Sequence, residues 1–253
     1  MMKNYRIMRK LAIIFIVAVL AFPLVSASSL EKPDWREGDY WNYEIVTVGI
    51  ERKETSSTTI VGMENITVGN ITYRCIVARV KGFIDELLYY DEEAMGIVKE
   101  TIYDNETNKT EEKIHDPPQF LIKYPIFIGK KWNTTVEWKN DSVILQLECV
   151  GKKDITAGAG KFDCYVIKMD YIFPNNTTNP SFYQFYYVSG KVGTIVRTEG
   201  YGNGTLVGYT DLLSFHYSAS PGEQQDYNTV IVAAASIAVF VSLIALYKFK
   251  RSK

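Results

Sequence analysis

The sequence predicts a mainly β protein, in which two tandem antiparallel β repeats form one curved sheet or half-barrel, followed by one C-terminal transmembrane helix. Three observations predict it: an apolar segment at each end of the chain, nine N-glycosylation sequons between these segments, and an internal repeat with alternating strand patterns. Together they indicate an ectodomain that is exported and anchored to a membrane.

The N-terminal segment has the pattern of a signal peptide. Residues 11–25 are apolar, and Val25-Ser26-Ala27 is a small-residue cleavage site. The basic residues before the apolar run are Lys3, Arg6, Arg9 and Lys10. We therefore predict a signal peptide over residues 1–27, cleaved after Ala27. If it were retained as a second anchor, its basic flank would stay in the cytoplasm and the middle of the chain would still lie outside.

The C-terminal segment has the length and composition of a membrane span. Val230 to Tyr247 carry no charge, and as a helix these residues would cover roughly 27 Å, close to the thickness of a hydrocarbon core. Residues 248–253 are basic, whereas residues 198–229 contain no Lys or Arg. The positive-inside rule therefore places a cytoplasmic tail at 248–253, a transmembrane helix at 230–247 and a stalk at 217–229. This predicts a single-pass protein of the cell membrane with its N-terminus outside.

Charge and sequons both describe the segment between the two ends. It holds 20 basic and 29 acidic residues, a net charge of −9, which argues against nucleic acid as a partner. Nine of the thirteen asparagines begin an Asn-x-Ser/Thr triplet, far more than chance gives, so we expect a glycoprotein. The candidate sites are Asn65, Asn70, Asn105, Asn108, Asn133, Asn140, Asn175, Asn176 and Asn203.

Three cysteines are too few for a disulfide-built module, so the domain must rest on its own core. They allow one bridge at most. A bridge between Cys149 and Cys164 would close a short loop, and one between Cys75 and Cys164 is the rival. Which of the two can form depends on the strand register, and the sequence leaves both open.

An internal repeat is the most informative feature. Residues 61–80 align without a gap on residues 150–169, with seven of twenty positions identical. The register continues on both sides, so we divide the ectodomain into β repeat 1 at 28–116 and β repeat 2 at 117–216. We expect any functional site at the junction between the repeats, where duplicated sheets leave a groove.

Each repeat reads as a series of antiparallel strands. Tyr40 to Val48, Tyr73 to Phe83 and Phe162 to Phe173 alternate apolar and polar residues. Phe182 to Val188 is apolar on both faces, which suits a central strand or a strand that lines a ligand cavity. A short helix near Gln119 to Lys123 is the one helical element that we expect in the ectodomain.

The second repeat also resembles a known class of domain. The pattern hydrophobic-Thr-x-Gly-x-x-Lys-Phe-x-Cys-x-Val at Ile155 to Val166, followed by residues 187–196, resembles uncharacterised β domains of archaeal and bacterial exported proteins. These domains are distantly similar to the half-barrel of periplasmic lipoprotein carriers. The first repeat departs from the pattern, with Asn70-Ile-Thr in place of the Gly-Lys turn. The resemblance implies a curved antiparallel sheet with an apolar concavity, and it implies no active-site residues. The sequon density and basic tail suggest an archaeal source.

No pattern predicts a catalytic residue, a metal site or a cofactor. Only His115 and His216 could serve as the base of a hydrolytic triad, and neither lies in a catalytic motif. We therefore expect a non-enzymatic binding or structural ectodomain whose partners are the membrane and an apolar small molecule or envelope proteins. A surface-layer or adhesion component is the alternative, and a hydrolase is the third possibility.

Overall fold

The computed structural model describes residues 29–50, 53–82, 85–104, 109–138, 141–173 and 182–219. The predicted signal peptide, transmembrane helix and cytoplasmic tail lie outside these ranges, as does the stalk beyond residue 219. No helix within the described ranges is both long enough and apolar enough to cross a membrane.

The described chain consists of antiparallel strands in two halves. The first half contains β1 (Tyr40–Thr47), β2 (Lys53–Val68), β3 (Ile71–Lys81), β4 (Asp85–Asp91), β5 (Ile97–Asp104) and β6 (Lys109–Gln119). The second half contains β7 (Lys131–Trp138), β8 (Asp141–Ala157), β9 (Gly160–Ile172), β10 (Phe182–Ser189), β11 (Thr194–Gly202) and β12 (Thr205–His216). The mainly β, antiparallel character predicted from the alternating pattern is confirmed.

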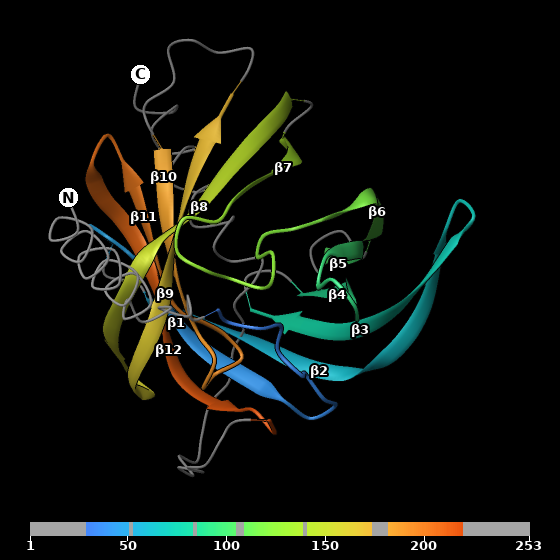
Figure 1. The fold of residues 1–253 in the computed structure, drawn as a ribbon, viewed down its shortest axis with the longest axis horizontal. Coiled ribbons are helices and arrows are strands. Elements are labelled where there is room, and N and C mark those ends of the chain that lie inside the picture. Colours follow the sequence, from blue (N-terminus) through green and yellow to red (C-terminus); the bar gives the residue numbers. More distant parts are fainter. Residues whose placement is uncertain are drawn as a thin grey trace, which may run out of the picture.

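All twelve described strands belong to one sheet, in the order β6-β5-β4-β3-β2-β1-β12-β11-β10-β9-β8-β7. Each half is a meander, and the first and last strands pair to join the halves. The sheet curls into a nearly closed barrel (Figure 1). Its edge strands β6 and β7 are connected by a side chain, because the Gln119 amide donates to the Thr135 carbonyl at 3.2 Å.

The two halves match each other in detail. In the first half the β2–β3 register shifts at Val61, and in the second half the β8–β9 register shifts at Val150. These valines are equivalent in the sequence repeat, and both are exposed. A β-bulge adds one residue to one strand and bends it, so each half contains a long hairpin that bends at the same place.

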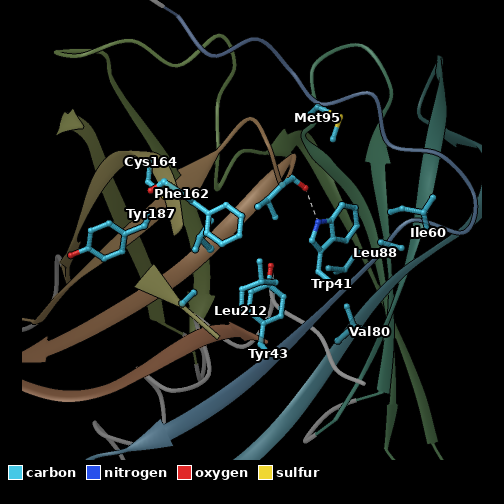
Figure 2. Packing of buried hydrophobic residues seen from close by; sticks show 14 of the residues in the cluster. Trp41, Tyr43, Ile60, Val80, Leu88, Met95, Phe162, Cys164, Tyr187 and Leu212 are labelled. Atoms are coloured by element: carbon cyan, nitrogen blue, oxygen red, sulfur yellow. Dashed lines mark hydrogen bonds between the residues drawn. The ribbon is translucent and has the colours of Figure 1, made fainter. Parts of the chain in front are cut away.

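The core is shared by both halves. Figure 2 shows Trp41 and Tyr43 of β1 beside Leu212 of β12, between first-half residues such as Leu88 and second-half residues such as Phe162. Trp41, Tyr43 and Leu212 are almost fully buried. Because the β1–β12 seam is buried from both sides of the junction, this cluster depends on side chains of both halves.

The structure corrects two predictions from the sequence, one for the segment after β6 and one for the end of the folded domain after β12. The short helix expected near Gln119 to Lys123 is wrong: Gln119 ends β6 and the next residues form bends. Apolar side chains of this segment pack into two core clusters, which favours an irregular extended path over a helix. The folded domain also continues past residue 216, since the Ser218 backbone N–H donates to Asp39 Oδ1 at 2.8 Å.

Candidate functional site

A small cavity lies where the two halves meet. Ile97 and Ile195 line it from equivalent positions, because Ile97 pairs with Tyr90 and Ile195 pairs with Val188 in matching registers. The complete lining is Trp35, Tyr90, Met95, Ile97, Leu121, Ile122, Tyr124, Tyr186, Thr194 and Ile195. The cavity therefore occupies the junction that the repeat pointed to.

The cavity is small and mainly apolar. Its volume is about 40 Å³, which is room for about three water molecules, whereas ligand pockets usually measure about 300 to 1,000 Å³. The lining residues that carry a polar group are Trp35, Tyr90, Tyr124, Tyr186 and Thr194. In this conformation the cavity can hold water or a very small molecule.

A strap, defined here as residues 120–126 between β6 and β7, covers the cavity. One end is tied by the Trp132 indole, which donates to the Phe120 carbonyl at 3.2 Å. The other end is tied by paired backbone bonds between Leu30 and Ile126, at 2.7 and 2.8 Å. Between these anchors the strap turns three of its side chains into the cavity. Movement of the strap would therefore enlarge the cavity without breaking the sheet.

Three donors of the first half, of which Trp41 and Tyr43 are buried and Trp35 is half-buried, hold the β10–β11 turn and the start of β11 beside the cavity. Each donates to a backbone carbonyl of the second half. The bonds are Trp35 Nε1 to Gly193 O at 2.9 Å, Trp41 Nε1 to Val192 O at 2.7 Å and Tyr43 Oη to Ile195 O at 2.6 Å. The indole of Trp35 also packs edge-on against Tyr90, with ring centroids 5.2 Å apart. These contacts fix the β10–β11 side of the cavity wall to the first half.

The first half adds charged groups to the face of the sheet that bears the cavity. Glu86, Leu88 and Tyr90 alternate along one face of β4, and Glu100 pairs with Leu88 on β5. His115 Nε2 of β6 lies 3.1 Å from Glu100 Oε1. The spacing is short, but its geometry is not that of a hydrogen bond, so His115 Nε2 has no hydrogen-bond partner.

Burial and these carboxylates both act on the cavity tyrosines. Burial raises the pKa of Tyr90 far above the usual value of a phenol, and the negative charges of Glu86 and Glu100 raise it further. Burial likewise raises the pKa of Tyr124, with a smaller contribution from Tyr217. Both phenols are neutral at pH 7 and can donate hydrogen bonds.

The two histidines that were considered as potential triad bases have different neighbours. His115 meets the Glu100 carboxylate, whereas His216 stacks on Tyr40 with ring centroids 6.0 Å apart. Among the described residues, no group of three His, Cys, Asp or Glu side chains is placed to hold a metal ion. Glu86 and Glu100 carried no signal in the sequence, because an isolated glutamate in a strand is ordinarily exposed.

The candidate glycosylation sites divide between described and undescribed positions. Asn65, Asn70, Asn133 and Asn203 are exposed. The sites that lie outside the described residues are Asn105, Asn108, Asn140, Asn175 and Asn176. The exposed side chains are accessible to a modifying enzyme, and their occupancy stays a prediction.

The three cysteines are free thiols in three different core clusters. Cys149 pairs with Ile167 in the β8–β9 register and Cys164 pairs with Lys153, on either side of the Val150 bulge. Neither the Cys149–Cys164 bridge nor the Cys75–Cys164 bridge is formed. Cys75 and Cys164 are equivalent in the repeat, so each half places one thiol at the same depth of its long hairpin.

Comparison with known proteins finds a family match in the second half of the chain. Residues 133–212 match the DUF3108-like family, which covers 80 of the 253 residues. No curated protein matches the chain.

Solved structures of bacterial proteins resemble the chain at low sequence identity. A candidate lipoprotein from Parabacteroides distasonis is 17% identical with a TM-score of 0.41, covering 74% of this chain and 99% of its own. A candidate exported protein with a YmcC-like fold from Bacteroides fragilis is 13% identical with a TM-score of 0.42, covering 75% and 100%. The hypothetical lipoprotein YmcC from Escherichia coli is 9% identical with a TM-score of 0.34, covering 69% and 84%. At the level of sequence, the second half of the chain is similar to the DUF3108-like family.

Proposed function

We propose that the protein is a non-enzymatic binding protein of the cell surface, which binds an apolar small molecule at the junction between its two halves. The halves are products of a duplication, and the domain is held outside the cell by the predicted transmembrane helix at 230–247. One observation carries the proposal: the cavity is lined by apolar side chains from both halves and is covered by a separate strap.

The strap supports a binding role more than a purely structural one. A core that served stability alone would be filled, because buried apolar side chains normally pack without voids. Here Leu121, Ile122 and Tyr124 cover a residual space, and the strap is fixed at its ends. Lifting these three side chains would open the cavity to a ligand of ordinary size.

The export signals support the location. The exposed sequon asparagines and the acidic surface suit a domain outside the cell, and the apolar segments at both chain ends suit export and anchoring. A ligand that reaches this domain would come from the envelope or from outside.

Binding of cyclohexanol to the full-length protein in neutral lipid nanodiscs tests the proposal. Trp35 lines the cavity, so its fluorescence reports occupancy. We expect saturable binding that Leu121→Trp abolishes by filling the cavity. The matched control is Ile128→Trp, on the same linker but 59% exposed, which should bind as the wild type does. No saturable signal above that of empty nanodiscs would overturn the proposal.

A surface-layer or adhesion role is the second candidate, and an aromatic patch favours it. Tyr183, Phe185 and Tyr201 lie on the face of β10 and β11 opposite the cavity, and all three are half-buried. Tyr183 stacks on Tyr201 with ring centroids 5.0 Å apart, and Phe185 packs edge-on against Tyr201 at 5.9 Å. Aromatic side chains gathered on a surface are typical of protein interfaces.

Photo-crosslinking in intact cells separates this candidate from the first. Phe185→benzoylphenylalanine should trap an envelope protein, while the same replacement at Ile71, which is 56% exposed on the tip of the β2–β3 hairpin, should not. Equal products at both positions, or none at either, would count against a partner at the patch.

A further inference from the structure

The interior of the first half carries charges that the interior of the second half lacks. The repeat aligns Val80 with Met169, which pair with Glu86 and Gln184 respectively, so these two residues are equivalent. By the same registers Glu100 corresponds to Thr198 and His115 to Leu212. Three positions that are neutral or apolar in one half are therefore ionisable in the other.

The neutral positions of the second half are internally satisfied. Gln184 accepts hydrogen bonds from the hydroxyls of Tyr171 and Tyr186 at 3.0 and 3.2 Å. Thr198 and Thr210 bond to each other at 2.7 Å. In the second half, the buried polar groups at these positions form hydrogen bonds with each other and need no ligand, as expected for a purely structural role.

Among the ionisable positions of the first half, Glu86 is buried and Glu100 and His115 are half-buried, and His115 Nε2 has no hydrogen-bond partner. Glu86 is 3% exposed, and the side chains of His115 and Glu100 are 9% and 18% exposed. His115 Nε2 makes no hydrogen bond, although it lies beside the Glu100 carboxylate. Lys113 is opposite Glu100 in the β5–β6 register, yet the two form no ion pair. Leaving a buried polar atom without a hydrogen-bond partner is unfavourable, so stability alone does not account for His115 Nε2 at this position.

The position of the cluster relative to the cavity indicates its use. Tyr90 lines the cavity, and Glu100 lies beside Leu88, two residues from Tyr90 along the same face of β4. Trp35, Tyr90 and Tyr124 provide aromatic rings in the lining of the cavity. Carboxylates together with aromatic rings are the groups that bind an ammonium ion, through charge pairing and cation–π contact.

We infer that the ligand of the junction cavity is an apolar amine, whose body lies against the apolar lining and whose cationic head points toward Glu100, His115 and Glu86. This inference rests on the proposed function and adds the chemical class of the ligand to it. An anionic head, such as a carboxylate or phosphate, would be repelled from the same place.

Three probes with the same ring and different heads test the inference on the full-length protein in neutral nanodiscs. We expect cyclohexylamine to bind about tenfold or more tightly than cyclohexanol, the effect of one partly buried charge pair, and cyclohexanecarboxylate to bind most weakly. Cyclohexanol binding with no preference for the amine would overturn the amine inference and leave the cavity proposal standing. If no probe binds, both fail.

Variants then locate the head group. Glu100→Gln should weaken cyclohexylamine binding about tenfold and leave cyclohexanol binding unchanged. The matched control is Glu112→Gln, on the opposite face of the same β5–β6 hairpin and 58% exposed, which should change neither. Equal losses for amine and alcohol in Glu100→Gln would show a structural effect and contradict the inference. Glu86→Gln, assayed in the same way, keeps the test open if the first variant does not fold.

Discussion

Some equivalent positions of the two halves carry side chains of different charge. Gln184 and Glu86 occupy equivalent, buried positions, but Gln184 accepts and donates hydrogen bonds as a neutral amide, whereas the Glu86 carboxyl does both only when it is protonated. The second half therefore fills this position with a group that never carries a charge, and the first half fills it with an ionisable one.

Replacing Gln184 tests how much this network stabilises the second half. Gln184→Leu leaves the Tyr171 and Tyr186 hydroxyls without their shared acceptor, so we expect the free energy of unfolding to fall by about 2 kcal/mol. Urea denaturation followed by fluorescence measures the change. In the Tyr171→Phe background the loss should be smaller by at least about 0.5 kcal/mol, and full additivity would refute the shared network.

The buried thiols give the domain an alkaline limit. Burial raises the pKa of Cys75 to about 11 and that of Cys164 to about 12, with smaller contributions from nearby carboxylates. A folded pKa above the unfolded value stabilises the fold below about pH 8.5, and this stabilisation is lost as the pH rises toward the folded pKa.

We therefore expect the free energy of unfolding to decrease above pH 9 and to decrease less in Cys164→Ala. Denaturation series from pH 7 to pH 10.5 measure both slopes. Thiol reagents should leave the folded protein unmodified at pH 8 and react with all three cysteines in urea. Rapid labelling of the folded protein would contradict the burial of these groups.

At the scale of elements, the long hairpins show how one extra residue directs a pair of strands. The β8–β9 hairpin bends at Val150, and its tip meets β12, where the Ala159 backbone N–H donates to the Leu212 carbonyl at 2.9 Å. Gly158 permits this approach, since a Cβ there would lie 3.0 Å from Leu213 Cδ2. The β2–β3 hairpin has the exposed Asn70 at its tip and extends away from the barrel (Figure 1).

Deleting Val150 tests the role of the bulge. Without the extra residue the hairpin should straighten and withdraw Ile155 and Phe162 from the shared core, at about 1.5 to 3 kcal/mol for each side chain. Val150→Ala keeps the bulge, and because Val150 is 46% exposed it should change the stability by less than about 0.5 kcal/mol. Equal effects in urea denaturation would show that the bulge does not position the hairpin.

At the scale of the whole molecule, the β10–β11 turn couples the halves. Gly193 has a φ of +71°, its carbonyl accepts the Trp35 indole bond, and a Cβ there would lie 2.7 Å from the Tyr217 ring. Because this turn and the β1–β12 seam join the halves, we expect them to unfold together.

The substitution Gly193→Ala should lower the midpoint of one cooperative transition without splitting it. Left-handed backbone costs a non-glycine residue about 1 to 2 kcal/mol, and the clash with Tyr217 adds about 1 to 3 kcal/mol. Gly204→Ala is the control, because Gly204 has a φ of +78° with open space around it, and it should show the backbone term alone. Two separate transitions, followed by fluorescence and circular dichroism, would contradict a shared core.

The sequence by itself determined the β class and the position of strands such as β1, β3, β9 and β10, and it indicated the junction as the place to look for a site. These follow from local patterns, because alternation, turn residues and the 61–80 and 150–169 repeat are properties of short segments. The tertiary structure alone decided that β1 pairs with β12, that the strap covers a cavity, and that Glu86, Glu100 and His115 share one face. Such contacts join residues far apart in the chain, and the bulges shift the strand register between them, so no local pattern records which side chains meet.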